Sequence, residues 1–195
     1  KRFSITSLIM PMTDDIVSTV LNTDDGSLDF QDYFVRRRCV PVVRSVSFAN
    51  IQSTRPSSGL LKYFAKTPPE AIIICPSNPF LSIEPILNVP GLRQLVMNLR
   101  IPVLAVSPIV NGGSLKGPTA KILREFGMSV SAVEVARYYL RKYPGLISTF
   151  VIDTSDSGLT NTIQALGVDV FVTPTVMNSE RDKKELALSL LDYLA

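Results

Sequence analysis

The sequence predicts an α/β fold: a doubly wound, mostly parallel sheet between helices, with a β-rich insertion near the N-terminus. From about Pro56 onward, short apolar runs of strand length alternate with longer segments of helical pattern, as in parallel βαβ units. Before Pro56, apolar and polar residues alternate around turn signals, as in antiparallel hairpins. We therefore expect residues 1–55 to form a β-rich cap with one core strand, and residues 56–195 to form a Rossmann-like α/β core.

The first part of the chain has the pattern of short strands. Alternating and β-branched residues over 16–21 and 27–30 flank a turn at residues 22–26, which predicts a β-hairpin. In the extended segment that follows, Arg36 and Arg38 would share one face and Arg37 the other. The strands expected in this part are residues 5–10, 16–21, 27–30, 31–38 and 42–48.

The second part alternates strand and helix patterns. Strands are expected at residues 71–75, 103–106, 147–152 and 170–172. Helices are expected at residues 57–65, 83–99 with a break near Pro90-Gly91, 119–126, 132–141, 158–166 and 180–194. Gly127 and Gly167 stand at two of the helix ends, where glycine is favoured, and Ser179 is a candidate N-cap.

Composition excludes several classes of protein. Of 195 residues, 46% are hydrophobic and 19% are charged, which predicts a chain that folds around a core. A net charge of +3 does not indicate a nucleic-acid partner. No apolar run is long enough to cross a membrane, and the first residues lack the apolar core of a signal peptide. We therefore expect a cytoplasmic protein with neither a nucleic-acid nor a membrane partner.

The chain has two cysteines and no histidine. Cys39 and Cys75 lie far apart on strand-like segments, which predicts reduced thiols rather than a disulfide or a zinc site. The absence of histidine removes the commonest general base and the commonest metal ligand from the candidate residues. Any bound metal is expected to be a hard cation held by oxygen atoms, such as magnesium.

The first candidate site is the turn that follows the predicted strand 71–75. Its polar and proline residues are Pro76, Ser77, Asn78 and Ser82. Free backbone N–H groups and uncharged hydroxyl and amide side chains at a helix start suit a phosphate or a sugar hydroxyl. The carboxyl ends of strands in an open α/β sheet are also where ligands bind. The alternative is an ordinary turn with a capping Asn or Ser.

The second candidate site is the loop 107–119, which follows the next strand at the same edge of the sheet. Gly112 and Gly113 permit close approach of the backbone, and Lys116 can neutralise an anion. The spacings GxxxxGK[ST] and GxGxxG are absent. The alternative is a flexible surface loop with a solvated lysine. Together with Ser107, this loop and the turn after residue 75 favour a shared phosphate site.

The third candidate is the motif Met12-Thr13-Asp14-Asp15, which follows the first predicted strand. Paired carboxylates at the end of a strand can hold magnesium or orient a nucleophile. The alternative is an Asx-type turn that opens the hairpin.

The fourth candidate combines the aromatic pair Tyr33-Phe34 with the basic residues Arg36, Arg37 and Arg38. Aromatic rings can stack on a flat ring, and the planar guanidinium of arginine suits anionic ligands. The alternative is an exposed edge strand whose basic residues prevent pairing with other chains.

Six motifs of this chain, in this order, resemble those of the 2-phospho-L-lactate transferase family of coenzyme F-420 biosynthesis. They are PMTDD, DYFVRRR, CPSNPFLSIEPILNVPG, VLAVSPIVNGGSLKGPTAK, VIDTSDSG and VFVTPTVM. The resemblance covers essentially the whole chain, and the two long loops are specific to this family. A related branch of nucleotide- or sugar-nucleotide-binding gluconeogenesis factors shares the fold but carries a glycine-rich sequence in place of CPSNPF.

The resemblance implies a transferase. Family members move a 2-phospholactyl group, or a phosphoenolpyruvyl group in some bacterial members, from a GDP-linked donor to a ribityl hydroxyl of the deazaflavin FO. GMP leaves, and magnesium assists. Phosphoryl transfer depends on positioning and charge neutralisation more than on a strong base, so the chemistry fits a chain without histidine. The alternative is a nucleotide- or sugar-nucleotide-binding regulator of the same fold that does no chemistry.

The resemblance also implies positions for the ligands. Near the donor nucleotide and its phosphates would lie Pro76, Ser77, Asn78, Ser82, Ser107, Gly112, Gly113 and Lys116. Toward the deazaflavin would lie Met12, Thr13, Asp14, Arg36 and Arg37. The glycine-rich nucleotide-binding region at the N-terminus of family members has no counterpart in this sequence, so the main catalytic and metal-binding residues are expected outside it. An apolar face on the predicted helix 180–194 suggests a homodimer.

Overall fold

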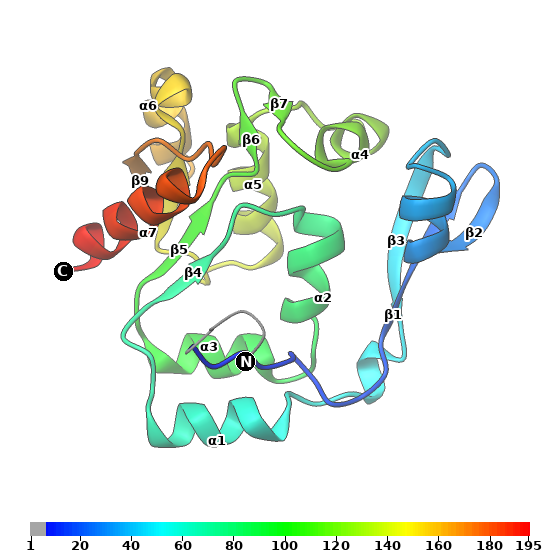
Figure 1. The fold of residues 1–195 in the computed structure, drawn as a ribbon, viewed down its shortest axis with the longest axis horizontal. Coiled ribbons are helices and arrows are strands. Elements are labelled where there is room, and N and C mark those ends of the chain that lie inside the picture. Colours follow the sequence, from blue (N-terminus) through cyan, green and yellow to red (C-terminus); the bar gives the residue numbers. More distant parts are fainter. Residues whose placement is uncertain (1–6) are drawn as a thin grey trace.

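Four parallel strands form the main sheet of the computed structural model, which describes residues 7–195 (Figure 1). In their order across the sheet they are β4 (Ile72–Ile74), β5 (Val103–Val106), β8 (Thr149–Ile152) and β9 (Asp169–Val172). All four lie where the apolar runs predict strands. The parallel α/β core is therefore confirmed.

Helices follow the strands of the main sheet, as predicted. They are α1 (Ser58–Lys66), α2 (Glu84–Leu87), α3 (Leu92–Leu99), α4 (Thr119–Glu125), α5 (Ala132–Lys142), α6 (Thr160–Gln164) and α7 (Glu180–Leu194). Shorter helical turns are η2 (Ile51–Ser53), η3 (Pro79–Ile83) and η4 (Thr154–Leu159). The predicted break at Pro90-Gly91 separates α2 from α3, and Gly91 has a φ of 83° that favours glycine.

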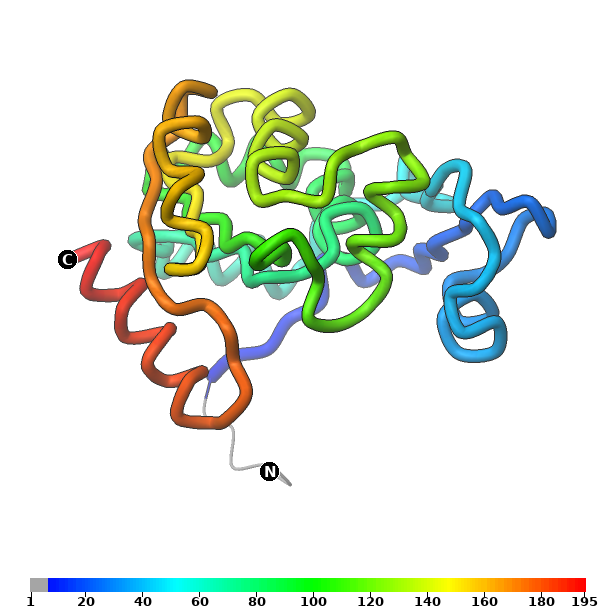
Figure 2. Tube along the Cα trace, turned by 90° about the horizontal axis from the view of Figure 1, so that it is seen from above, coloured from blue at the N-terminus to red at the C-terminus, as the bar shows by residue number. Residues whose placement is uncertain are grey.

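Helices cover both faces of the main sheet. Leu104 and Val106 of β5 pack with Leu186 and Leu190 of α7 on one face. Ala105, which points the opposite way along the strand, belongs to the larger hydrophobic cluster on the other face, together with apolar residues of α4, α5 and α6. Figure 2 shows α7 on one side of the strands and α5 and α6 on the other. The carboxyl ends of the strands form the edge where the site lies, and the first residues of α4 and α7 reach this edge.

A second, antiparallel sheet stands beside the core and forms the β-rich insertion that the sequence predicts (Figure 1). Its elements are β1 (Ser18–Thr23), β2 (Gly26–Asp29), the helical turn η1 (Asp32–Arg36) and β3 (Val43–Ala49), with strand order β2-β1-β3. We call residues 18–49 the hairpin subdomain. Its buried residues Leu21 and Tyr33 belong to the same hydrophobic cluster as the core. A domain boundary at residue 55 stays a prediction.

The segment predicted as an extended strand, residues 31–38, is instead a π-helical turn around η1, and this prediction was wrong. Two pairs of side chains explain the difference, because residues four apart meet on a helix and not on a strand. Asp32 and Arg36 form an ion pair at 3.5 Å, and the ring of Phe30 stacks on that of Phe34. Both pairs are visible in the sequence as a spacing of four.

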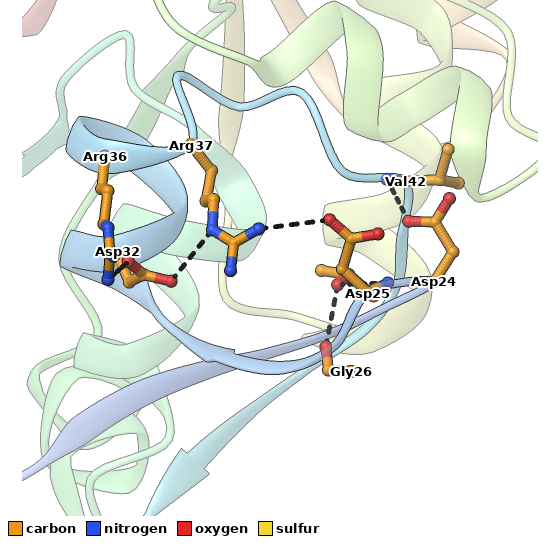
Figure 3. Close-up of polar contacts among 8 residues, drawn as sticks. Asp24, Asp25, Gly26, Asp32, Arg36, Arg37 and Val42 are labelled. Atoms are coloured by element: carbon orange, nitrogen blue, oxygen red, sulfur yellow. Dashed lines mark hydrogen bonds and ion pairs between the residues drawn. The ribbon is translucent and has the colours of Figure 1, made fainter.

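The basic residues after η1 therefore do not lie on the faces of a strand. Arg37 reaches two carboxylates, with its Nη1 3.5 Å from Asp25 and its Nε 3.5 Å from Asp32 (Figure 3). Arg38 has a left-handed backbone with a φ of 51°. The predicted arrangement, with Arg36 and Arg38 on one strand face, was wrong because the acidic residues of the hairpin turn and of η1 hold a helical turn in place.

Helix α4 fastens the hairpin subdomain to the core through two side chains, Lys121 and Glu125, which we call the α4 clasp. The ammonium of Lys121 donates to the carbonyl of Pro41 at 2.7 Å and lies 5.7 Å from the centre of the Tyr33 ring. The carboxylate of Glu125 accepts the backbone N–H of Val43 at 3.0 Å. The two side chains also form an ion pair with each other. The clasp thus joins α4 to Pro41, which precedes β3, and to Val43, which is the first residue of β3.

The residues before β1 run toward the start of α1. Asp14 accepts the backbone N–H of Ser58 at 3.0 Å, within the first turn of that helix. Residues 7–10 are irregular, so the strand predicted over 5–10 is not formed there, and residues 5 and 6 lie outside the described residues. None of the helices within residues 7–195 combines the length and the apolar character needed to cross a membrane.

Candidate ligand-binding site

The turn after β4 is built around the side chain of Asn78. Its Oδ1 accepts hydrogen bonds from the backbone N–H groups of Phe80 (2.9 Å) and Leu81 (3.0 Å), and so caps η3. Pro79 takes the first position of this turn, where a missing N–H costs nothing. The predicted succession of strand, tight turn and helix start is therefore confirmed, and Asn78 is the cap.

The other end of the Asn78 amide is unsatisfied. Nδ2 is buried and has no hydrogen-bond partner among the described residues, and the residue as a whole is only 8% exposed. A buried donor without a partner costs about 1–3 kcal/mol, so native proteins rarely leave one without a reason. Because Asn78 lines a cavity, an acceptor group of a bound ligand is a suitable partner.

The loop after β5 folds into a small hairpin. β6 (Ile109–Val110) pairs with β7 (Gly113–Ser114), and the turn between them has positive φ at Asn111 (48°) and Gly112 (71°), as a tight hairpin turn requires. The hydroxyl of Ser107 donates to the carbonyl of Ile109 at 2.8 Å and accepts its N–H at 3.1 Å. These bonds fix the loop where it leaves the strand.

A cavity of about 550 Å³ lies where the segments following β4, β5 and β9 meet. This is the edge at which ligands of open α/β sheets bind, and the volume is that of a small-molecule site. Residues that line it include Phe30, Phe34, Pro76, Ser77, Asn78, Ser82, Ser107, Lys116, Thr175, Met177, Asn178 and Lys183.

The structure brings the first two candidate sites together, as predicted. The residues singled out in these two sites that line the cavity are Pro76, Ser77, Asn78, Ser82, Ser107 and Lys116, and further residues of the loop 107–119 line it as well. Gly112 and Gly113 do not line it; they form the tip of the β6–β7 hairpin. The convergence of two loops at one sheet edge is thus observed, while the binding of a phosphate there stays a prediction.

The residues predicted to lie toward the deazaflavin are not in the cavity lining. The carbonyl of Met12 accepts the N–H of Ser57 at 3.0 Å, and the hydroxyl of Thr13 accepts the N–H of Asp15 at 3.2 Å. With Asp14 bonded to the first turn of α1, this motif has the turn and capping geometry of the alternative interpretation. Arg36 and Arg37 are likewise absent from the lining. Their contact with a deazaflavin stays a prediction.

Sequence reasoning missed two parts of the lining. One is Phe30, which stacks on the predicted Phe34; their spacing of four was the available signal for a helical turn. The other comes from the end of β9 and the first turn of α7. Its members are Thr175, Met177, Asn178 and Lys183. The signal for this second part was topological, because the end of a fourth parallel strand lies at the same edge as the other three.

The aromatic pair gives the cavity a flat apolar surface. The rings of Phe30 and Phe34 stack with centroids 5.4 Å apart and an angle of 21° between their planes. Phe34 is 43% exposed, so part of its surface remains available for contact. The neighbouring Tyr33 is fully buried and donates to the carbonyl of Cys39 at 3.5 Å. The pair available for stacking is therefore 30 and 34, rather than the adjacent residues 33 and 34.

The charge of the lining is positive. Among the described residues, the charged side chains that line the cavity are Lys116 and Lys183, and no carboxylate lines it. Lys183 forms an ion pair with Glu180, one turn earlier on the exposed surface of α7. No ion pair of Lys116 occurs within residues 7–195. A cavity of this charge favours an anionic ligand.

Asp153 connects the loops that follow β8 and β9, and the second of these loops lines the cavity. Its carboxylate accepts the N–H groups of Ser155 (2.9 Å) and Thr175 (2.7 Å) and the hydroxyl groups of both residues. Burial by itself raises the pKa of Asp153, but these four hydrogen bonds outweigh it and keep the pKa below its usual value. An ionised Asp153 thus positions Thr175 at the cavity.

The described residues do not supply a ligand set for magnesium. Within residues 7–195 there is no group of three or more His, Cys, Asp or Glu side chains that could hold a metal ion. Asp153 is occupied by hydrogen bonds, and the carboxylate of Asp156 accepts the N–H of Asn111 at 3.0 Å. The predicted magnesium ion therefore stays a prediction, and we derive no chemical step through it.

Comparison with known proteins identifies relatives along almost the entire chain. The sequence matches the family described as "2-phospho-L-lactate transferase CofD" over residues 1–184. It is 37% identical to the 2-phospho-L-lactate transferase of Methanosarcina mazei over 95% of this chain and 58% of that protein. It is 32% identical to the phosphoenolpyruvate transferase of Streptomyces griseus over 87% of this chain and 53% of that protein. The chain thus spans less than two thirds of the length of these relatives.

A solved structure has a similar fold. The crystal structure of a UPF0052 family member from Bacillus halodurans superposes with a TM-score of 0.61 at 15% identity. It covers 93% of this chain, and the chain covers 60% of that protein. At this identity the likeness concerns the fold alone. It supports the arrangement of the parallel sheet and its helices.

Proposed function

The chain belongs to the 2-phospho-L-lactate transferase CofD family, and from this premise we propose that it takes part in phospholactyl transfer in coenzyme F-420 biosynthesis. The group transferred is 2-phospholactyl or phosphoenolpyruvyl, the donor is GDP-linked, and the acceptor is the deazaflavin FO. The observation that carries the proposal is the cavity at the strand ends, where an unpaired buried amide, two lysines and an aromatic stack line one space.

The donor phosphates are proposed to bind between the turn after β4 and the loop after β5. The Asn78 Nδ2 group is a donor without a partner among the described residues, and Lys116 brings a positive charge to the same cavity. Hydrogen bonds to charged groups are stronger than those between neutral groups, so a phosphate oxygen would satisfy Asn78 well. Neutralising and orienting the phosphates is most of what a protein contributes to phosphoryl transfer.

The acceptor is proposed to place its fused ring system against Phe34. A deazaflavin is flat and aromatic, and the exposed part of the Phe30–Phe34 stack is a flat aromatic surface in the same cavity. Offset stacking contributes roughly 0.5–1.5 kcal/mol beyond the burial of area. This contact would hold the ring at one side of the cavity while the ribityl chain extends toward the phosphates.

In the proposed reaction, a ribityl hydroxyl of the acceptor attacks the phosphorus that carries the three-carbon group. The bond from that phosphorus to the oxygen of GMP breaks, GMP leaves, and the hydroxyl proton is released. No carboxylate of residues 7–195 lines the cavity, and the chain has no histidine. This part of the protein is therefore assigned the binding of phosphates and acceptor, and no residue in it is assigned the role of general base.

A fluorescence titration with FO tests the proposal. FO should bind at micromolar concentration, and GDP should change the affinity, because both ligands occupy one cavity. Phe34→Ala should weaken FO binding, while Phe34→Tyr retains an aromatic face and should bind FO normally. Binding of uridine nucleotides without any FO signal would contradict the proposal and favour the regulator of the same fold that does no chemistry.

A further inference from the structure

Two lysines reach the cavity from different elements. Lys116 belongs to the loop between β7 and α4, and Lys183 belongs to the first turn of α7. We propose that Lys183 binds the carboxylate of the three-carbon group, while Lys116 binds the phosphate. This inference rests on the proposed function and adds a specificity residue to it: the site would recognise a phosphate ester that also carries a carboxylate.

The charge of the lining matches such a ligand. 2-Phospho-L-lactate and phosphoenolpyruvate, the groups in the names of the relatives, each carry a carboxylate on the carbon that bears the phosphate oxygen. The described lining has two ammonium groups and no carboxylate. A ligand with two neighbouring anionic groups satisfies both lysines, whereas a simple phosphate ester leaves one unpaired. Electrostatic complementarity of this kind discriminates between ligands of similar shape.

The neighbours of each lysine indicate which one would bind the phosphate and which one the carboxylate. Lys116 shares its loop with Ser107, and both line the cavity together with Asn78, whose unpaired amide is proposed to bind the phosphate. Lys183 lies on the other wall, which also contains Thr175 and Asn178. The ammonium of Lys183 and the side-chain amide of Asn178 provide donors that a carboxylate oxygen accepts, whereas the hydroxyl of Thr175 already donates to Asp153.

The present partner of Lys183 is easily exchanged. Its ion pair is with Glu180, whose side chain is 90% exposed, and the side chain of Lys183 is 54% exposed. A pair this exposed contributes little, because water and salt screen both charges. A ligand carboxylate held by further donors of the cavity would therefore replace Glu180 as the partner of this ammonium group at little cost.

A capping box closes the start of α7. The carboxylate of Asp182 accepts the N–H groups of Asn178 and Ser179, both at 2.8 Å, and the hydroxyl of Ser179 accepts the N–H of Asp182 at 3.2 Å. These bonds use the backbone donors of residues 178, 179 and 182. Among the residues of this wall that line the cavity, Lys183 is the one that carries a positive charge.

Calorimetric titration of the 195-residue chain with matched ligands tests the inference. The ligands are phosphoenolpyruvate, ethyl phosphate as an ester without a carboxylate, and GDP. Lys183→Gln should weaken phosphoenolpyruvate binding about tenfold, the scale of one hydrogen bond to a charged group, and leave ethyl phosphate and GDP within about twofold. Lys116→Gln should weaken all three. Lys184→Gln removes the same charge from the next residue, which does not line the cavity, and should change none.

Three outcomes overturn the inference. They are equal weakening of phosphoenolpyruvate and ethyl phosphate by Lys183→Gln, an effect of Lys184→Gln as large as that of Lys183→Gln, and no binding of phosphoenolpyruvate by the unaltered chain. A failure of the proposed function would be seen in a different experiment, as the absence of a fluorescence change when FO is added. The Lys183→Gln variant should bind FO normally, which also shows that it is folded.

Discussion

The two sides of the cavity are held in place by different kinds of contact. Within each of its two loops, the phosphate wall, formed by residues 76–82 and 107–119, is fixed by hydrogen bonds between near neighbours, such as Asn78 with Phe80 and Ser107 with Ile109. One longer-range bond, from Asn111 to Asp156, ties the second loop to the core. The aromatic wall, Phe30 and Phe34, is carried by the hairpin subdomain. That subdomain is joined to α4 by bonds between residues 80 and 82 positions apart.

This difference has a consequence for stability. Contacts between near neighbours form as soon as the local backbone is in place, whereas distant contacts require closure of a long loop. We therefore expect changes in the phosphate wall to act on one turn and its ligand. Changes in the α4 clasp should instead release the aromatic wall as a unit, because the subdomain opens more easily than the core.

The largest effect is expected for Asn78→Ala. The substitution removes the acceptor for two backbone N–H groups and the cap of η3, so the free energy of unfolding should fall by about 2 kcal/mol. GDP binding should also weaken by about 1–3 kcal/mol, the value of an unmade buried hydrogen bond. Denaturant unfolding measures the first change and calorimetry with GDP the second.

Asn78→Asp separates the two roles of this residue. An aspartate keeps the oxygen that accepts from Phe80 and Leu81 but lacks the Nδ2 donor and adds a negative charge. The stability should therefore stay close to that of the unaltered chain, while GDP binding is lost. Retention of GDP affinity in this variant would remove Asn78 from the phosphate site.

The second largest effect is expected for the clasp. Lys121→Met removes the bond to the carbonyl of Pro41 and the ion pair with Glu125, and should lower the free energy of unfolding by about 1.5 kcal/mol. FO binding should weaken and GDP binding should not, because only the aromatic wall is released. Fluorescence and calorimetric titrations of one preparation measure both affinities.

A double-mutant cycle with Glu125→Gln sharpens this result. Glu125 also accepts the N–H of Val43, and an amide oxygen at the same position can still accept it. The interaction energy between the two substitutions should therefore be about 1 kcal/mol, with most of it due to the ion pair. Equal loss of FO and GDP affinity in the Lys121→Met variant would show that the two walls are not held independently.

The difference between contacts of near neighbours and contacts of distant residues also explains how much could be predicted from the sequence. The strands of the main sheet and the turn at Asn78 were predictable because each is encoded by neighbouring residues: an apolar run, a pair of prolines and a capping amide. The π-helical turn at residues 32–36 was missed. Alternation in the flanking strands suggested a further strand, although the spacing of four in Phe30–Phe34 and Asp32–Arg36 indicates a helix.

Other parts of the site could not be predicted from local patterns. Lys183 is one of several charged residues at the start of α7, and only the placement of β9 at the edge of the main sheet brings it to the cavity. Met12, Thr13 and Asp14 are expected near a ligand because their motif resembles that of the family. Their observed contacts are those of a turn and a helix cap, and their contact with a deazaflavin stays a prediction.

A smaller effect is expected for Phe34→Ala. The ring is 43% exposed, so its removal should change the free energy of unfolding very little. FO binding should weaken by about 1 kcal/mol through loss of stacking, and GDP binding should be unchanged. The outcome opposite to this, a loss of GDP affinity with intact FO binding, would place the nucleotide base rather than the deazaflavin on the aromatic wall.

The smallest effect is expected from acidification, and it tests the part of the lining that contains Thr175. The pKa of Asp153 lies below its usual value, because its hydrogen bonds to Ser155 and Thr175 outweigh its burial. A carboxyl group with a lower pKa in the folded state than in the unfolded state stabilises the fold above the unfolded pKa, about 4. This contribution is lost as the pH falls through the lower, folded pKa.

Asp153→Asn should therefore flatten the loss of stability below about pH 4, measured as the urea midpoint at successive pH values. At pH 7 the variant should be less stable, since an amide offers one acceptor oxygen where the carboxylate offers two to Ser155 and Thr175. An unchanged slope below pH 4 would show that Asp153 ionises alike in both states. Because Thr175 lines the cavity and the clasp contains no residue bonded to Asp153, acid should weaken ligand binding at the strand ends before it releases the aromatic wall.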